Sequence, residues 1–409
     1  MKPDEIKPEA TSSEQVRGQD YHSFLSRMLY DSPLHRLPGK IALVAIMVVI
    51  VLLSSLIWST WLTPLSNGRL VLLAVAVAFL GSLVGLVWIR YLDRREPESW
   101  WYWIGVLVFA MLFTVTPAVV FNSISPFVFT IGFNEEFWKV VPLLLLILFA
   151  PTTVNGVRDG MIYGALGGFA FNMVEIADYF LLDTYPAQGI AAGLTEALAR
   201  LSFWGVGVHV IWSMLVGAGI GLAVQTQNRR TKILAPLGAY LLAAITHGIQ
   251  DMGGGVILMT VAMSMLLTLQ GAEVDVNDPT AGPEIISENL RWITRIEAIL
   301  INIIILPIVI AFLLKSGNWE RQVIQEGLAD ESDAVITPEE YEGVKAERRF
   351  RLRRLPGFPR RIGRQVRNAQ NRLAFHKAYL KRKSRPIEGD PLIDYYRAEV
   401  IRLRSGAEQ

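Results

Sequence analysis

Two adjacent carboxylates and a lysine open an apolar run in the sequence GFNEEFWKVVPLLLL, from Gly132 to Leu146. A charged side chain near the middle of a membrane span costs about 2.5–3.5 kcal/mol even on lenient insertion scales. Glu135 and Lys139 are four residues apart and share a helix face, whereas Glu136 points about 100° away from Glu135. A structural ion pair would explain Glu135 and Lys139 but leaves Glu136 unexplained. We therefore expect these carboxylates to carry chemistry.

Other ionisable residues interrupt the apolar stretches that follow: Glu175 in FNMVE, His209, and the pair His247 and Asp251 in HGIQD. At about 1.5 Å of rise per residue, Glu135, Glu175, His209 and His247 all fall in the outer half of their spans. Two of these spans run toward the outer face and two run away from it. Unrelated polar residues would scatter in depth, so the match predicts one polar site that opens toward the outer face.

The residue types suit the activation of a water molecule. Clustered, buried carboxylates can act as a base at neutral pH, and a second histidine, with its tautomer fixed by Asp251, can stabilise an oxyanion or protonate a leaving amine. The same side chains can hold zinc, and no HExxH spacing decides between the two mechanisms. We assign no metal from the residues alone; if one is present, the expected ligands are His209, His247 and Glu175. The candidate catalytic residues are Glu135, Glu136, Glu175, His209, His247 and Asp251, with Lys139 in a supporting role.

The composition and the apolar stretches of the chain predict the elements that position this site. The chain has 409 residues, of which 52% are hydrophobic, and no cysteine, which excludes disulfides and zinc–thiolate sites. Apolar stretches of spanning length predict an all-α fold: a polytopic membrane helix bundle of about eight transmembrane helices with a basic cytoplasmic C-terminal tail. The predicted spans are 41–63, 70–90, 101–121, 128–150, 159–181, 201–224, 233–252 and 297–314. The shorter apolar segment 256–269 is interpreted as an outer interfacial or re-entrant helix.

Loop charges orient the bundle. Basic residues mark the loops assigned to the inside, while 271–290 carries five acids and no base before Arg291. The positive-inside rule then places both termini in the cytoplasm of a multi-pass plasma-membrane protein. The predicted domains are an N-terminal cytoplasmic segment (1–40), a transmembrane domain (41–315, with its motif core at 93–251) and the tail (316–409).

Four motifs, taken in order along successive spans, resemble those of the PrsW family of intramembrane proteases, in the superfamily of CAAX proteases and bacteriocin-processing enzymes. EEFWK is similar to the family's EExxK motif, FNMVE to its FxxxE, and HGIQD to its HxxxD/N, with His209 between the last two. DRREPES, from Asp93 to Ser99, resembles the EPEP-like stretch that precedes them. Ile176 departs from the pattern, where the family would have Asn.

The resemblance implies a hydrolase: an intramembrane endopeptidase that cleaves single-span membrane protein substrates near the outer leaflet. It leaves open whether a divalent metal such as zinc assists, as in a metalloprotease, or whether a carboxylate and histidine alone activate the water. Two other classes remain: an ion- or proton-coupled transporter, which would carry internal repeats and polar residues through its full depth, and a catalytically inactive membrane scaffold. The inner halves of these spans are apolar or small, which favours the protease.

The tail carries sixteen Lys or Arg between Lys345 and Arg385, against one acid, Glu347. Apolar residues interleave with these bases as in an amphipathic helix broken at Pro356 and Pro359. We expect this segment to bind anionic lipid head groups on the cytoplasmic side. No recognition motif accompanies the charge, so we expect no nucleic-acid partner.

Overall fold

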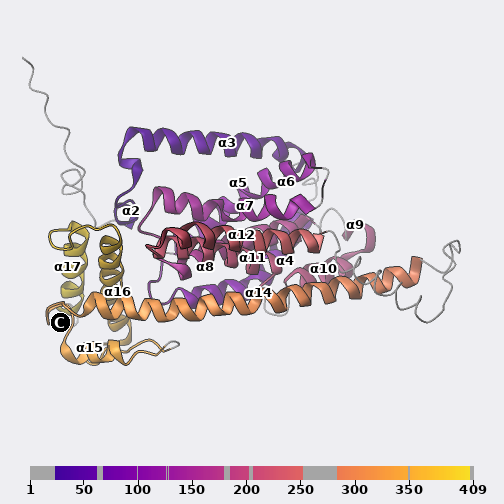
Figure 1. Ribbon diagram of the computed structural model, residues 1–409. Helices are drawn as coiled ribbons and strands as arrows, with labels where there is room; N and C mark the ends of the chain where they lie inside the picture. Colours follow the sequence, from indigo (N-terminus) through magenta and orange to yellow (C-terminus); the bar gives the residue numbers. More distant parts are fainter. Residues whose placement is uncertain are drawn as a thin grey trace, which may run out of the picture.

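The computed structural model describes residues 24–61, 68–98, 100–125, 127, 129–178, 185–201, 206–251, 283–348 and 351–405. Within these ranges the chain is built from helices, and the only β pairing is an isolated bridge between Arg348 and Arg351. Figure 1 shows the long helices running side by side, with a smaller group of helices across one end. The segment 256–269 and residues 1–23 lie outside the described residues.

The described residues include seven helices or helix pairs that are long and apolar enough to cross a membrane. They are α3 (Leu37–Trp61), α4 (Gly68–Leu92), α5 (Trp100–Phe113) with α6 (Val115–Ile124), α8 (Val157–Asp178), α11 (Val208–Gln225), α12 (Arg229–Asp251) and α14 (Pro283–Leu328). The predicted polytopic helical bundle is thereby confirmed, and the chain is a multi-pass membrane protein. The predicted span 101–121 is divided between two helices, since Thr114 interrupts it between α5 and α6.

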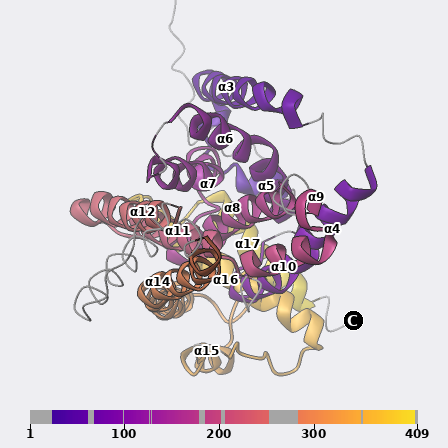
Figure 2. The ribbon, with the colours of Figure 1, turned by 90° about the vertical axis from the view of Figure 1, so that its right-hand side faces the viewer.

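The eighth predicted span corresponds to α7 (Phe129–Phe149), which lies within the bundle (Figure 2). It is long enough to span, but Glu135, Glu136 and Lys139 give it three charges in its first half. All three side chains are buried, so the charges face protein and not lipid. The total of eight spans stays a prediction.

Helix α8 lies at the centre of the bundle because its glycines let neighbouring helices approach. A Cβ atom at Gly160 or Gly164 would collide with the backbone of α11, and one at Gly167 would collide with the carbonyl oxygen of Lys139 on α7. The small residues in GALGG therefore do what their type predicts, which is to allow close helix packing. As a result, the C-terminal part of α8 is fixed against the charged part of α7.

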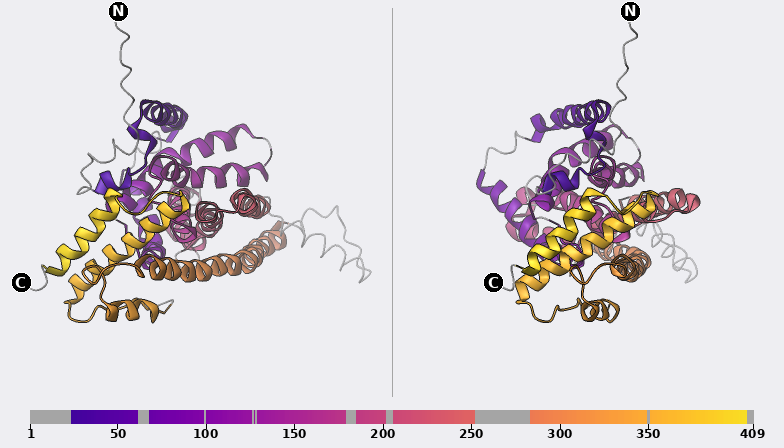
Figure 3. Two further views of the ribbon diagram at one scale, coloured as in Figure 1. Left: turned by 60° about the vertical axis from the view of Figure 1, so that its left-hand side comes forward. Right: turned by 90° about the vertical axis from the view of Figure 1, so that its left-hand side faces the viewer.

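The tail is a folded unit. Helix α14 continues out of the bundle (Figure 1) and joins α15 (Pro338–Lys345), α16 (Arg360–Arg382) and α17 (Pro391–Ser405) around a separate hydrophobic core. Helices α16 and α17 lie together across the end of the bundle (Figure 3). The apolar residues of α16, among them Leu373, Phe375 and Leu380, are buried in this core and so are not free to enter a membrane. Binding of anionic lipid by the remaining basic side chains stays a prediction. The domain boundaries also stay a prediction.

A buried ion network attaches this tail unit to the bundle. Arg95, which follows α4, lies 3.1 Å from Glu320 of α14 and 3.3 Å from Glu347. The same Glu320 lies 2.8 Å from Arg158 in the first turn of α8. The Asn371 side chain of α16 donates to the carbonyl oxygen of Arg95 at 2.7 Å. The tail therefore covers the end of the bundle at which α8 begins.

Short helices complete the described fold. They are α2 (Phe24–Met28), the 3₁₀ helix η1 (Pro33–His35), α9 (Tyr185–Gln188) and α10 (Ile190–Leu201).

Candidate active site

All seven predicted site residues lie at one end of the bundle, away from the tail. Glu135, Glu136 and Lys139 are near the start of α7, Glu175 near the end of α8, His209 at the start of α11, and His247 and Asp251 at the end of α12. The antiparallel order of these four helices therefore brings them together, as the matched depths predicted. The seventeen residues from Arg158 to Glu175 place the site about 25 Å from the tail network.

Lys139 is the cationic centre of the site, and its side chain is fully buried. The ammonium nitrogen lies 2.8 Å from Oε1 of Glu136, 3.2 Å from Oε2 of Glu135 and 2.6 Å from Nδ1 of His209. The ring of Phe171, from the FNMVE motif, lies 5.0 Å away and adds a cation–π contact. One lysine thus neutralises part of the charge of both motif glutamates.

His247 is held on both sides. Its Nδ1 lies 3.0 Å from Oε1 of Glu136, and its Nε2 lies 3.3 Å from Asp251 and 3.7 Å from Oε2 of Glu135. The buried partner, Glu136, favours the tautomer with the proton on Nδ1, which leaves the Nε2 lone pair facing Glu135. The indole of Trp212 stacks on the imidazole at a centroid distance of 4.3 Å. The ring is therefore fixed in orientation.

His209 has the opposite tautomer. Its Nε2 lies 2.8 Å from Glu175, so the proton on Nε2 points to that carboxylate. The Nδ1 lone pair faces the interior of the site, where it accepts a hydrogen bond from Lys139. Each histidine thus has one nitrogen hydrogen-bonded to a carboxylate, Glu136 for His247 and Glu175 for His209, and a lone pair on the other nitrogen. This is the usual arrangement of metal-ligating histidines and their supporting carboxylates.

Two contacts were missed by sequence reasoning. The Asn122 side chain, at the end of α6, donates to Oε1 of Glu135 at 2.9 Å. Trp212 lies three residues after His209 on α11, a spacing that puts the two on neighbouring helix positions. That spacing could have predicted that Trp212 lies beside His209. No residue near Asn122 in the sequence indicated that its partner is Glu135.

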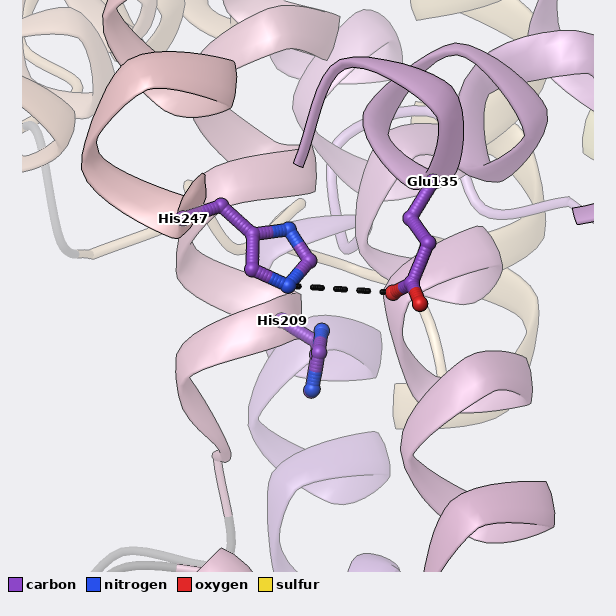
Figure 4. Close-up of side chains that lie close together, drawn as sticks. All are labelled: Glu135, His209 and His247. Atoms are coloured by element: carbon purple, nitrogen blue, oxygen red, sulfur yellow. Dashed lines mark ion pairs between the residues drawn. The ribbon is translucent and has the colours of Figure 1, made fainter. Parts of the chain in front are cut away.

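The residues fit a divalent metal by their donor chemistry. Glu135, His209 and His247 each offer a ligand atom, and these atoms lie within 4.8 Å of one another. Figure 4 shows the three side chains converging from different helices. Two imidazoles and one carboxylate form a common zinc set that leaves a position for water. This grouping differs from the predicted one: Glu135 replaces Glu175, which binds the outer nitrogen of His209.

Charge also favours a cation here. Four carboxylates, those of Glu135, Glu136, Glu175 and Asp251, surround the single ammonium of Lys139. If all are ionised and the histidines neutral, the site carries three net negative charges. A dication would offset most of this charge, which is costly inside a membrane.

Fold and site together define a polytopic helical membrane protein with a buried carboxylate–histidine centre. Residues 73–270 match the family model described as PrsW family intramembrane metalloprotease. This match confirms the predicted resemblance over the part of the chain that contains all four motifs. No curated protein and no solved structure matched the chain. The family supports a peptidase, and its description implies a metal ion.

Proposed function

We propose that the protein is an intramembrane metalloendopeptidase that cleaves membrane-anchored, single-span protein substrates near the outer leaflet. The observation that carries this proposal is the convergence of Glu135, His209 and His247 within 4.8 Å, in the part of the chain that matches the PrsW-family model. The tail lies in the cytoplasm, because basic residues flank the spans at that end, including Arg90 and Arg229. The site then opens toward the outer leaflet of the plasma membrane.

Two imidazoles and a carboxylate are a known ligand set of catalytic zinc in proteases, and zinc is the metal we propose. Glu135, His209 and His247 would hold it, with Glu136 and Glu175 orienting the two imidazoles. When bound, the ion supplies Lewis acidity for the scissile carbonyl. In the structure the Lys139 ammonium contacts Nδ1 of His209. With the metal bound to His209, the ammonium would lose this contact and keep its contacts with Glu135 and Glu136.

Glu136 is the proposed proton acceptor. Its Oε1 already contacts Lys139 and His247, whereas its buried Oε2 has no hydrogen-bond partner among the described residues. Oε2 is the carboxylate oxygen left to take a proton from the attacking water and return it to the leaving amine. Asp251, the more exposed partner of His247, stabilises that ring as charge develops.

The test is cleavage of a panel of single-span reporters by purified protein in liposomes. Wild type, Glu136→Gln and His209→Ala are compared, each with and without a strong chelator. We expect wild type to cut near the outer leaflet, both variants to be inactive, and chelation to abolish cleavage. Activity that survives chelation would favour the alternative mechanism, in which a carboxylate and histidine activate the water without a metal. A validated panel left intact by folded wild type would favour the transporter or scaffold.

A further inference from the structure

An apolar cavity lies in the half of the bundle nearest the tail, and none of the seven predicted site residues lines it. Its volume is about 360 Å³, and it is open on one side. Its walls come from η1 and α3, from α5 and from the C-terminal half of α7; Met47, Phe109 and Leu146 are representative. From Trp101 to Phe109 it extends roughly 12 Å along α5, from the membrane boundary toward the middle of the bundle. This size is within the range of ligand pockets, about 300–1,000 Å³.

Hydrogen bonds to neighbouring helices hold α3 beside this cavity. Near the end of α3 away from the tail, the Thr116 hydroxyl of α6 donates to Oγ of Ser54 at 2.8 Å. At the tail end, the hydroxyl of Ser32 donates to the carbonyl oxygen of Phe149, at the end of α7. The cavity lies between these two attachments. It is therefore a built groove in the fold, open to lipid, where an apolar chain can enter between α3 and α7.

Two basic residues lie close to the groove-lining residues in the sequence. Arg36 and Lys40 lie on the chain between two lining residues, Leu34 and Leu43. Both are exposed, and neither forms an ion pair with a described residue. An apolar groove with cations at the membrane boundary is complementary to a phospholipid, whose acyl chain is apolar and whose anionic phosphate lies at the surface.

We propose that this groove is a binding site for one phospholipid with an anionic head group, drawn from the leaflet on the tail side. One acyl chain lies between α3, α5 and α7, and the head group contacts Arg36 and Lys40. The site does not depend on the proposed protease chemistry. It also differs from the predicted lipid surface of the tail, since none of its lining residues comes from the basic helices.

A large side chain introduced at Gly105 would block this groove. It lies on the cavity wall in α5, and a Cβ atom added there would meet no atom within 4 Å. Gly105→Phe therefore fills the groove without distorting the backbone around it. Gly238 on α12 is the matched control, because it is equally free of neighbours but does not line the groove.

The experiment uses full-length protein in phosphatidylcholine nanodiscs doped with a phospholipid that carries a photoreactive group in one acyl chain. Phosphatidylglycerol and phosphatidylcholine probes with identical chains are compared, and labelled peptides are mapped by mass spectrometry. We expect label on the groove-lining parts of α3, α5 and α7, at least fivefold stronger with phosphatidylglycerol. Gly105→Phe should lower it at least fivefold, whereas Gly238→Phe should not change it.

Arg36→Gln/Lys40→Gln should abolish the preference for phosphatidylglycerol but keep the label in the groove. The mapped position in wild type needs no substitution, so it decides the proposal even if a variant folds poorly. Label spread evenly over all lipid-facing helices would overturn it. So would equal labelling by the two probes, or equal labelling of well-folded Gly105→Phe and Gly238→Phe.

Discussion

Lys139→Met should strongly destabilise the protein, because among the described residues the lysine is the cation that compensates the carboxylates of the site. Its side chain is fully buried and contacts Glu135, Glu136 and His209 within 3.2 Å. Removing one partner of a buried ion pair costs about 3–5 kcal/mol, since the other charge is left uncompensated. Two carboxylates lose their partner here, so we expect the upper part of that range. The ratio of folded to unfolded protein should fall at least roughly 100-fold.

A double-mutant cycle separates the stranded charge from the loss of packing. Glu136→Gln alone should cost about 1.5–3 kcal/mol, the usual value of a hydrogen bond to a charged group. In Lys139→Met/Glu136→Gln one carboxylate is no longer stranded, so the double variant should be more stable than the sum of the single effects by about 2 kcal/mol. The assay is reversible unfolding in mixed micelles, followed by tryptophan fluorescence, for which the buried Trp138 and Trp212 are reporters.

The control is Lys315→Met, at an exposed position on α14 where no ion pair with a described residue is formed. It should change the free energy of unfolding by less than about 0.5 kcal/mol. A cost below about 1 kcal/mol for Lys139→Met, or single effects that add within about 0.5 kcal/mol, would refute the idea that Lys139 compensates the buried carboxylates.

Three further predictions follow from the same structure. Gly167→Ala should abolish folding or cleavage, because its Cβ would collide with the carbonyl oxygen of Lys139, whereas Gly238→Ala should be neutral in the same thermal-unfolding and reporter assays. Burial opposes the charge of Asp390, but the hydrogen bond and charge of His376, together with hydrogen bonds from Tyr30 and the backbone of Ile393, hold the pKa of Asp390 below its ordinary value. This depressed pKa stabilises the tail above about pH 4, so limited proteolysis of the tail should accelerate as the pH falls below that value, and less so in Asp390→Asn. Metal removal should lower the melting temperature of wild type, and zinc should restore it, but neither should affect His209→Ala/His247→Ala.

The depth of the candidate site residues could be predicted from the sequence, whereas the contacts between their side chains could not. Depth along a span follows directly from residue number, so Glu135, Glu175, His209 and His247 could be placed at one level without a structure. Which donor atoms face one another depends on the rotation of each helix and on side-chain rotamers. That is why Glu175 was expected beside the two histidines, whereas in the structure Glu135 is the carboxylate grouped with them. Asn122 was missed for the same reason.

The tail was the least predictable part. Its sixteen basic residues suggested a helix lying on lipid, because a charge run gives no sign of what its apolar face will meet. The partners of that face come from α14, α15 and α17, which are separated from α16 in the sequence. Likewise, Arg95, Glu320 and Glu347 pair across more than two hundred residues, and no local pattern indicates such a network. The interruption at Thr114 was not predicted, because the apolar run continues through it.

The most direct test of the central claim measures metal content and reporter cleavage together in Glu135→Gln and Glu136→Gln. Glu135 is the proposed ligand and Glu136 the proposed proton acceptor, and Gln at position 136 still accepts the hydrogen bond from His247. Glu135→Gln should therefore lose both zinc and activity. Glu136→Gln should keep about one zinc per chain yet cleave at least roughly 100-fold more slowly. Substantial cleavage by a folded Glu136→Gln, or full zinc binding by Glu135→Gln, would contradict these assignments.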